Sequence, residues 1–377
     1  MLFSRILKCL TIPILFLCVL MIVSSSKNQR IAQAKAQLLA KGFSVKELYR
    51  FNPIRESRFK PKYVFDTEEL CITQHNISSR QKASEIMEEL KLLSPRISNI
   101  GCSGTSFTDQ DAVLLTQMPK LGVLAIDGSE LSNRGLATLS KLEHLTGITI
   151  HGLQITEQEP DWLANNSNLQ AIRLHKCQIG PNTFRQLSKL TNLTRIKIPH
   201  TNVTSADLQY LTNHPRLSEL ILPGSEIDDR AAAHLKQMKS LQRLDLSNTE
   251  VGDEVCKQIA QLNQLIYLNL DKTNVTDSGA QAIMAGCWNL KYLSFNDCEI
   301  SIKAFPATQY WPPNLNSLTL ANTSLTSKEI LQLYSEHSSL AHLNYDWAPE
   351  SDPNHQKYIK IENSRMSQIQ IEHNRNL

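Results

Sequence analysis

Glycine is scarce in this sequence, with 13 glycines among 377 residues. They form no Gly-rich phosphate loop and no Gly-x-Ser-x-Gly turn, and neither His-Glu-x-x-His nor Cys-x-x-Cys occurs. Those motifs would place a phosphate cradle, a nucleophile or metal ligands at a defined turn or helix. The sequence therefore lacks the common signatures of nucleotide binding, serine hydrolysis and zinc chemistry, and we expect a non-enzymatic protein without a cofactor.

The sequence also has only a small excess of positive charge. Its net charge of +3 does not by itself indicate a nucleic-acid partner. The cations are nevertheless concentrated between residues 27 and 62, where ten of them face only Glu47 and Glu56. A solvated basic linker with a helix from Ile31 to Leu48 explains this segment, and contact with anionic lipid headgroups is the alternative. The ten cations are Lys27, Arg30, Lys35, Lys41, Lys46, Arg50, Arg55, Arg58, Lys60 and Lys62.

The long apolar run of the sequence is Leu10–Val23, which follows Arg5 and Lys8 and precedes three serines. This order is typical of a signal peptide. Counted from Ile6 the run has 18 residues, near the lower limit for a membrane-spanning helix. We favour an uncleaved single-pass membrane anchor, because the site near Ser25 lacks alanine at the small-residue positions. Cleavage would instead give a secreted or periplasmic protein, and the balanced flanking cations leave the orientation open.

The strongest pattern is a frame, Leu-x-x-Leu-x-Leu-x-x-(Thr/Ser/Cys)-x-(Val/Ile/Leu), that recurs at intervals of 24 and later 25 residues. Its middle alternates apolar and polar residues as a half-buried strand does. Residues typical of helix N-caps, such as Thr204, Asp228 and Thr276, follow it and precede a helical stretch. Thr326 with Glu329 and Thr156 with Glu159 have the spacing of capping boxes. Such a unit cannot bury its apolar face alone, so neighbouring units must stack. The frames start at Ile97, Leu121, Leu145, Leu169, Leu193, Leu217, Leu241, Leu265, Leu290, Leu315 and Leu340.

Over residues 97–347 these frames closely resemble the leucine-rich-repeat family. The ninth position and the Val-Thr-Asp-x-Gly sequence of Val275–Gly279 are similar to the cysteine-containing subclass and its bacterial membrane-anchored or exported relatives. The resemblance implies an α/β fold, a right-handed horseshoe solenoid of about eleven repeats with a parallel concave sheet. The F-box that often precedes such repeats in eukaryotes has no counterpart here, so a ubiquitin-ligase role is not carried over. The ninth positions are Cys177, Thr201, Ser225, Thr249, Thr273, Cys298 and Thr323.

Five segments follow from these patterns: a signal anchor or signal peptide over residues 1–26, a basic juxtamembrane linker or helix over 27–66, an N-terminal cap over 67–96, the repeats over 97–347 and a tail over 348–377. In the cap, Leu70–Ile72 is a predicted strand and Ala83–Leu93 a predicted helix. In the tail, Tyr358–Ile361 and Gln368–Ile371 alternate as the arms of a hairpin would, with disorder as the alternative.

The third, fifth and seventh frame positions should line the concave face. On successive strands they bring together a basic patch and then an aromatic and acidic patch, residue types that dominate protein interfaces. We therefore predict a protein partner bound there, against the alternative that the face is polar only because it is solvated. The predicted binding residues are Arg173, His175, Arg195 and Lys197, followed by Arg243, Asp245, Tyr267, Asn269, Asp271 and Tyr292.

Asp127, His151 and His175 occupy one column of the predicted sheet. Adjacent strands lie about 4.8 Å apart, close enough to share protons or a divalent metal ion. Three ligands in a straight column do not converge easily on one ion, so we predict no metal site and favour a solvated polar column. Two alternatives to a binding scaffold remain open: an envelope component that self-associates, and an enzyme that uses this column.

Proline breaks the pattern in the repeat that starts at Leu290, where Pro306, Pro312 and Pro313 forbid a regular helix. The convex side should be extended or turn-like there. Phe305, Tyr310 and Trp311 either replace the missing leucines in the core or form an exposed docking surface. Cys9 and Cys18 lie in the apolar segment, and no two of the other six cysteines share a column in adjacent repeats, so we expect no disulfide framework.

Overall fold

The computed structural model describes residues 26–53, 63–74, 81–155, 161–163, 166–180, 182–305, 311–345, 354, 356–357 and 360–361. The chain divides into two compact units, Met1–Leu145 and Thr146–Leu377, here called the N-terminal unit and the C-terminal unit. The predicted membrane segment Leu10–Val23 lies outside the described residues. Within the described residues no helix is both long and apolar enough to span a bilayer.

The N-terminal unit begins with a helix over residues 26–40, which buries Ile31, Ala34 and Leu38. The prediction that this helix extends to Leu48 is wrong. The chain leaves the helix at Gly42, whose φ of 85° is a left-handed conformation that glycine adopts without steric cost.

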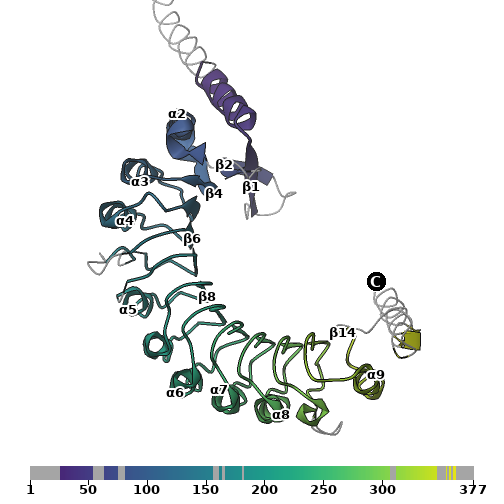
Figure 1. The fold of residues 1–377 in the computed structure, drawn as a ribbon. Helices are drawn as coiled ribbons and strands as arrows, with labels where there is room; N and C mark the ends of the chain where they lie inside the picture. Colours follow the sequence, from purple (N-terminus) through teal and green to yellow (C-terminus); the bar gives the residue numbers. More distant parts are fainter. Residues whose placement is uncertain are drawn as a thin grey trace, which may run out of the picture. The chain divides into compact units, whose positions relative to one another are not determined.

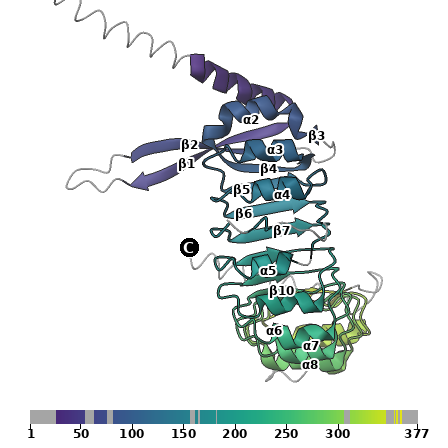
Figure 2. The same ribbon diagram turned by 90° about the vertical axis from the view of Figure 1, so that its left-hand side faces the viewer.

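Strand β1 (Phe43–Pro53) follows Gly42 and pairs antiparallel with β2 (Tyr63–Gln74). The predicted boundary between linker and cap, at residues 66 and 67, therefore falls inside β2. Only Leu70–Thr73 of β2 pairs with β4 (Ile97–Ser106), so the rest of the hairpin extends beyond β4 (Figure 2). The hairpin was missed because the basic residues of this segment obscure its strand pattern.

The predicted cap helix Ala83–Leu93 is present as two short helices, η1 and α2, with Ile86 between them. The remainder of the N-terminal unit alternates strands with helices: β4 pairs in parallel with β5 and with the short β3. The elements are β3 (Gln81–Lys82), η1 (Ala83–Glu85), α2 (Met87–Leu93), η2 (Ser94–Arg96), α3 (Asp109–Leu115), β5 (Val123–Asp127) and α4 (Asn133–Leu139).

The C-terminal unit contains a parallel sheet whose neighbouring strands align at an offset of one repeat, as in Gly147↔Ala171 and Arg243↔Tyr267. Every frame from Leu145 to Leu340 therefore contains a strand at its third to fifth positions. This confirms an α/β solenoid with a long parallel sheet. The strands are β6 (Gly147–His151), β7 (Ala171–His175), β8 (Arg195–Lys197), β9 (Glu219–Ile221), β10 (Arg243–Asp245), β11 (Tyr267–Asn269), β12 (Tyr292–Ser294), β13 (Ser317–Thr319) and β14 (His342–Asn344).

Within this unit the strands line the inner, concave side and the helices the outer side (Figure 1). The frame leucines fill the space between the two layers: in one repeat Leu244, Leu246, Val251, Val255 and Ile259 are all fully buried. The helices are α5 (Thr183–Leu187), η3 (Ser205–Leu211), η4 (Asp229–Ala231), α6 (Ala232–Leu235), α7 (Asp253–Ile259), α8 (Asp277–Gly286), η5 (Ile302–Ala304) and α9 (Ser327–Glu336).

From Cys177 to Thr323 the ninth frame position is a small side chain that donates a hydrogen bond to a backbone carbonyl. Thr249 Oγ1 donates to the carbonyl of Leu246 at 2.6 Å, and Thr273 Oγ1 donates to that of Leu270 at the same distance. Where cysteine takes this place, Cys298 Sγ donates to the Leu270 carbonyl at 3.0 Å. These bonds satisfy carbonyls that the turn after each strand would otherwise leave buried without a partner.

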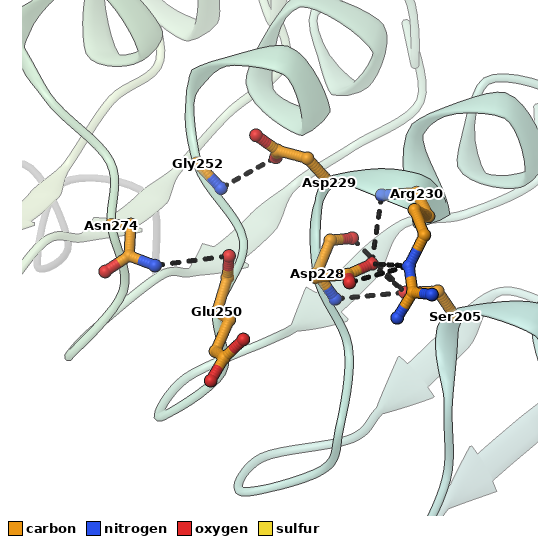
Figure 3. Close-up of polar contacts among 7 residues, drawn as sticks. All are labelled: Ser205, Asp228, Asp229, Arg230, Glu250, Gly252 and Asn274. Carbon is orange, nitrogen blue, oxygen red and sulfur yellow. Dashed lines mark hydrogen bonds and ion pairs between the residues drawn. The ribbon is translucent and has the colours of Figure 1, made fainter.

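In the C-terminal unit, three successive repeats have an aspartate at the thirteenth frame position that bonds to the repeat that follows: Asp229, Asp253 and Asp277. Asp229 Oδ1 accepts a hydrogen bond from the Gly252 backbone N–H at 2.8 Å (Figure 3). Asp253 Oδ1 accepts from the backbone N–H groups of Thr276 at 2.9 Å and Gly279 at 3.0 Å. These carboxylates cap the first turn of the following helix, where free N–H groups and the helix dipole favour an anion. We call this set the aspartate ladder.

Several helix caps predicted from the sequence are confirmed. Thr276 accepts from Ser278 N–H, Asp228 accepts from Arg230 N–H, and Thr326 forms a capping box with Glu329. The second predicted box, Thr156 with Glu159, lies outside the described residues.

Trp311 belongs to the core, as the first of the two interpretations predicted. Its side chain is 5% exposed and stacks on the His337 ring at 3.6 Å between centroids. Phe305 is partly exposed, and Tyr310 lies outside the described residues. In the tail, Lys360 and Ile361 are helical, so the predicted strand Tyr358–Ile361 is wrong at these residues; its second arm lies outside the described residues.

Removal of one carboxylate of the aspartate ladder should destabilise the protein. Asp253→Ala leaves two backbone N–H groups and the Thr276 hydroxyl without their acceptor. The free energy of unfolding should fall by about 1–2 kcal/mol. Urea unfolding followed by circular dichroism measures this change. The matched control is Glu254→Ala, because among the described residues the Glu254 side chain bonds to Lys257 and Gln258 of its own helix and to none in another repeat. Equal midpoints for both variants would contradict a role of the ladder in stability.

Candidate functional site

The predicted binding residues lie on the concave face of the C-terminal unit, where strand register sets which of them are neighbours. Arg195 is paired with Glu219, and Lys197 with Ile221. Further along, Arg243 is paired with Tyr267, and Tyr267 with Tyr292. Because paired residues of adjacent strands lie about 5 Å apart, side chains in one column are in contact range. The structure therefore brings the residues of β7–β12 together as one continuous strip, which we call the concave strip.

Glu219 connects the two halves of the concave strip. Its Oε1 atom accepts from Lys197 Nζ at 2.9 Å and from Arg243 Nε at 3.2 Å. The residue is only 7% exposed, so its carboxylate is held between two cations close to the sheet surface. Glu219 stands at the third position of the frame from Leu217, but it is not among the predicted binding residues. The only available signal was that it is an acid between cations on neighbouring strands.

Arg243, Tyr267 and Tyr292 form a stack along the strip. The Arg243 guanidinium lies 4.2 Å from the centroid of the Tyr267 ring. The rings of Tyr267 and Tyr292 stack with centroids 4.4 Å apart and planes at 5°. Burial, and secondarily the neighbouring Tyr292 and Asp245, raises the pKa of Tyr267 to about 12. Tyr267 therefore stays neutral, and its half-buried ring presents a fixed aromatic surface that keeps a hydroxyl able to donate.

The aspartates of the strip are held by their own neighbours. Asp245 Oδ1 accepts from Ser247 Oγ at 2.7 Å and from the Ser247 N–H at 3.0 Å. Asp271 accepts from the Asn296 N–H at 2.8 Å and from the Ser294 hydroxyl. These bonds fix the carboxylates in place, so the acidic part of the strip is rigid before any partner binds.

The basic patch differs from one strand to the next. Lys197 is already neutralised by Glu219, whereas Arg173 and Arg195 are exposed and form no salt bridge with any described residue. The His175 ring lies 5.0 Å from His151 and 6.3 Å from His200, measured between centroids. Burial lowers the pKa of His175 below its usual value, and it is lowered further by the charges of His151, Lys176, His200 and Arg173.

His200 was missed in the sequence because it stands at the eighth frame position, which was not expected to reach the concave face. This position takes a left-handed conformation in repeat after repeat, with φ of 52° at Lys176, 54° at His200 and 55° at Asn248. The turn is stabilised across repeats, since the His200 N–H donates to the Pro223 carbonyl at 2.7 Å. It leaves the His200 ring beside His175.

The predicted column of Asp127, His151 and His175 is divided between the two units. Asp127 belongs to the N-terminal unit, where its Oδ1 accepts from the Ser129 N–H at 2.9 Å. His151 and His175 are adjacent in the C-terminal unit. Across the part of the chain that the structure describes, no three His, Cys, Asp or Glu side chains are grouped so as to hold a metal ion.

A groove of about 490 Å³ runs along the flank of the C-terminal unit, beside the turns that follow the strands. Asp228 in this groove accepts from Ser205 Oγ at 2.8 Å and from Arg230 Nε at 2.7 Å (Figure 3). Both acidic and basic side chains line the groove, so its charge selects neither anions nor cations. The charged lining consists of Glu226, Asp228, Arg230, Glu250 and Lys272.

No protein-family model and no curated protein matches this sequence. Among solved structures, the chain is similar to an internalin from Listeria monocytogenes, with a TM-score of 0.49 and 16% identity over 76% of this chain and 85% of that one. It is also similar to the leucine-rich-repeat ectodomain of the Arabidopsis receptor kinase HAESA in complex with a peptide hormone. There the TM-score is 0.48 and the identity 14%, over 74% of this chain and 46% of that one, about half of its length.

Glu219→Ala should loosen the concave strip, because Lys197 and Arg243 lose their shared acceptor. We expect a loss of about 1–2 kcal/mol in the free energy of unfolding, reduced by the ability of both cations to turn towards water. Near-ultraviolet circular dichroism should also change, since Arg243 no longer holds its place over Tyr267. Glu219→Gln retains an acceptor of the same size and should lose less than half as much stability. Unchanged stability and spectra in Glu219→Ala would show that Glu219 does not organise the strip.

Proposed function

We propose that this chain is a non-enzymatic binding scaffold of the leucine-rich-repeat family, in its cysteine-containing subclass, whose concave strip binds a protein partner. The subclass assignment is supported by cysteine and threonine at the ninth frame position, where both donate to the same carbonyls. A scaffold role is supported by a rigid sheet that presents charged and aromatic side chains in fixed columns.

The observation that carries this proposal is the stack of Arg243, Tyr267 and Tyr292. Tyrosine and arginine are the residues most enriched at energetic centres of interfaces. A tyrosine loses little side-chain entropy on binding because it has two rotatable bonds, and stacking removes most of that freedom beforehand. Polar groups surround the stack on β10–β12, as the rim of an interface surrounds its apolar centre.

Replacing both stacked tyrosines should abolish partner binding while the fold persists. Tyr267→Ser with Tyr292→Ser removes two half-buried rings from the face of the sheet, not from the core. A benzophenone amino acid in place of Ser317, which is paired with Tyr292 across the sheet, would crosslink a bound partner in native membranes. We expect a single adduct that disappears in the double variant.

Tyr210→Ser is the matched control, because Tyr210 is an exposed tyrosine in η3 on the outer side. The adduct should persist in this variant. An adduct of twice the mass of the chain would support the self-associating envelope component instead. A partner adduct that survives the loss of both strip tyrosines would contradict the proposal.

We further propose that the N-terminal segment Leu10–Val23 anchors the scaffold in a membrane. The support comes from the sequence, where 18 residues from Ile6 interrupted only by Lys8 can cross a thin bilayer if that lysine reaches the headgroups. The alternative is a secreted or periplasmic protein whose segment is removed by cleavage.

The full chain should remain with the membrane after washing at alkaline pH and be released only by detergent. Leu15→Arg together with Leu20→Arg should move it to the soluble fraction, because central cations oppose insertion by about 2.5–3.5 kcal/mol each. Mass spectrometry of the native protein decides between the two forms: an intact N-terminus supports the anchor, and a mature form lacking the apolar segment excludes it. Protease treatment of intact cells then shows which side of the membrane carries the repeats.

A further inference from the structure

We infer that β6 and the first part of the concave strip, β7 and β8, form a docking surface for an acidic segment of the protein partner, and that this docking tightens on mild acidification. The inference rests on the proposed scaffold function and adds the chemistry of the partner. It is carried by Arg173 and Arg195, two exposed cations on adjacent strands that form no salt bridge with any described residue.

The surface consists of six side chains that are cationic or can become so. The frame segments 147–152, 171–176 and 195–200 contain no Asp or Glu. Arg173 and Arg195 are exposed and form no salt bridge with any described residue, whereas Lys197 is neutralised by Glu219 at the border. The six side chains are His151, Arg173, His175, Lys176, Arg195 and His200.

A peptide carboxylate satisfies this surface better than a nucleic acid does. The cations occupy three adjacent strands, a width of about 10–15 Å at the spacing of a parallel sheet. Beyond them Asp245 and Asp271 continue along the same face, held in place by Ser247 and Asn296. A polyanion long enough to release many counterions would have to pass these carboxylates. A short acidic segment that ends before β10 meets only cations.

The histidines give the surface its dependence on pH. His175 is faced by Arg173 and Lys176 from its own repeat, by His151 from β6 and by His200 from the turn after β8. All of these neighbours are cationic or neutral, so the free protein resists protonation of His175. Carboxylates placed over the cluster reverse that environment and favour the protonated rings.

The sign of the linkage follows from this difference. The pKa of His175 lies below its usual value in the free protein and rises in the complex, so the complex binds more protons than its separated parts. Affinity therefore increases as pH falls from neutrality through the pKa of the complex. It levels off below the pKa of the free protein and decreases again near pH 4, where the carboxylates of the partner become protonated.

The test measures fluorescence anisotropy of a fluorescein-labelled deca-glutamate peptide with the detergent-solubilised full chain at pH 7.5 and pH 6.0. The dissociation constant should be about three- to ten-fold lower at pH 6.0, as expected for one or two added exposed charge pairs. Arg173→Glu with Arg195→Glu should abolish binding at both pH values. Lys236→Glu with Lys239→Glu makes the same change in net charge at exposed positions after helix α6 and should bind as the unsubstituted protein does.

The histidine contribution is isolated by the pH ratio within one variant. His175→Gln with His200→Gln should change its dissociation constant less than two-fold between the two pH values. A ratio equal to that of the unsubstituted protein would overturn the role of the histidines. A short oligothymidylate that binds more tightly than the peptide, with the same dependence on Arg173 and Arg195, would overturn the assignment to an acidic peptide.

Failure of this inference is distinguishable from failure of the scaffold. If the benzophenone residue at Ser317 captures a partner through Tyr267 and Tyr292 while deca-glutamate binding is unaffected by reversal of Arg173 and Arg195, the scaffold stands and the acidic docking surface is wrong. If the peptide binds as described and no partner is captured at Ser317, the docking surface stands and the tyrosine stack is not the interface.

Discussion

The register between repeats is the constraint on which the concave strip depends, and the aspartate ladder is a principal interaction that holds it. A parallel sheet of three-residue strands has few hydrogen bonds per strand, and a slip of one residue would turn every inward leucine outward. Asp253 prevents such a slip from the opposite side of the repeat, because its carboxylate fits only against the N–H groups that start the next helix. The fit is close enough that a Cβ atom at Gly279 would lie 2.4 Å from Asp253 Oδ1. The Val-Thr-Asp-x-Gly sequence therefore fixes the register on both sides of its repeat. The backbone N–H groups of Thr276 and Gly279 donate to Asp253 of the preceding repeat, and Asp277 accepts from the Ser301 N–H of the following one.

Because the register is fixed, residues at the same position of successive repeats become neighbours on the surface of the sheet. Because residues 24 or 25 positions apart stand side by side, a tyrosine repeated once becomes a stacked pair, as at Tyr267 and Tyr292. A histidine repeated once becomes a pair of rings 5.0 Å apart, as at His151 and His175. Such contacts need no folding of loops around them, and they are formed before any ligand arrives. This preorganisation is the physical reason that a flat, open sheet face can bind a partner without a deep pocket.

The sequence predicts the repeating part of the fold well because its period and burial pattern are both explicit: the strands of the C-terminal unit and the caps at Asp228, Thr276 and Thr326 follow directly from the frame. The hairpin of β1 and β2 was not predicted, because it occurs once. No recurring spacing of apolar residues marks its strands, as it does in the repeats. In the site, the register predicts which residues lie in one column of the sheet. It does not predict which neighbour a long side chain contacts. Glu219 therefore looked like one acid among several, although Lys197 and Arg243 both turn towards it. His200 lies beside His175 because its backbone has a left-handed conformation. A glycine at this position would have suggested such a conformation from the sequence, but a histidine does not.

The charges of the concave strip are arranged in order along the solenoid, and Glu219 explains how the order is kept. Without an acid at β9, Arg195, Lys197 and Arg243 would form one run of mutually repelling cations. With it, Lys197 and Arg243 share one carboxylate, which reduces their repulsion and lowers the net charge of the three residues to +1. The tyrosine stack begins at Arg243, directly after the unpaired cations Arg173 and Arg195 of β7 and β8. Asp245 and Asp271, on β10 and directly after β11, then place negative charge beside the stack. An acidic partner of the kind proposed would therefore bind in one orientation, because the reverse orientation would place its acidic end over Asp245 and Asp271 and away from Arg173 and Arg195. Polarity of this kind costs little stability, since charges of opposite sign on an exposed face contribute more to the orientation and rate of association than to affinity.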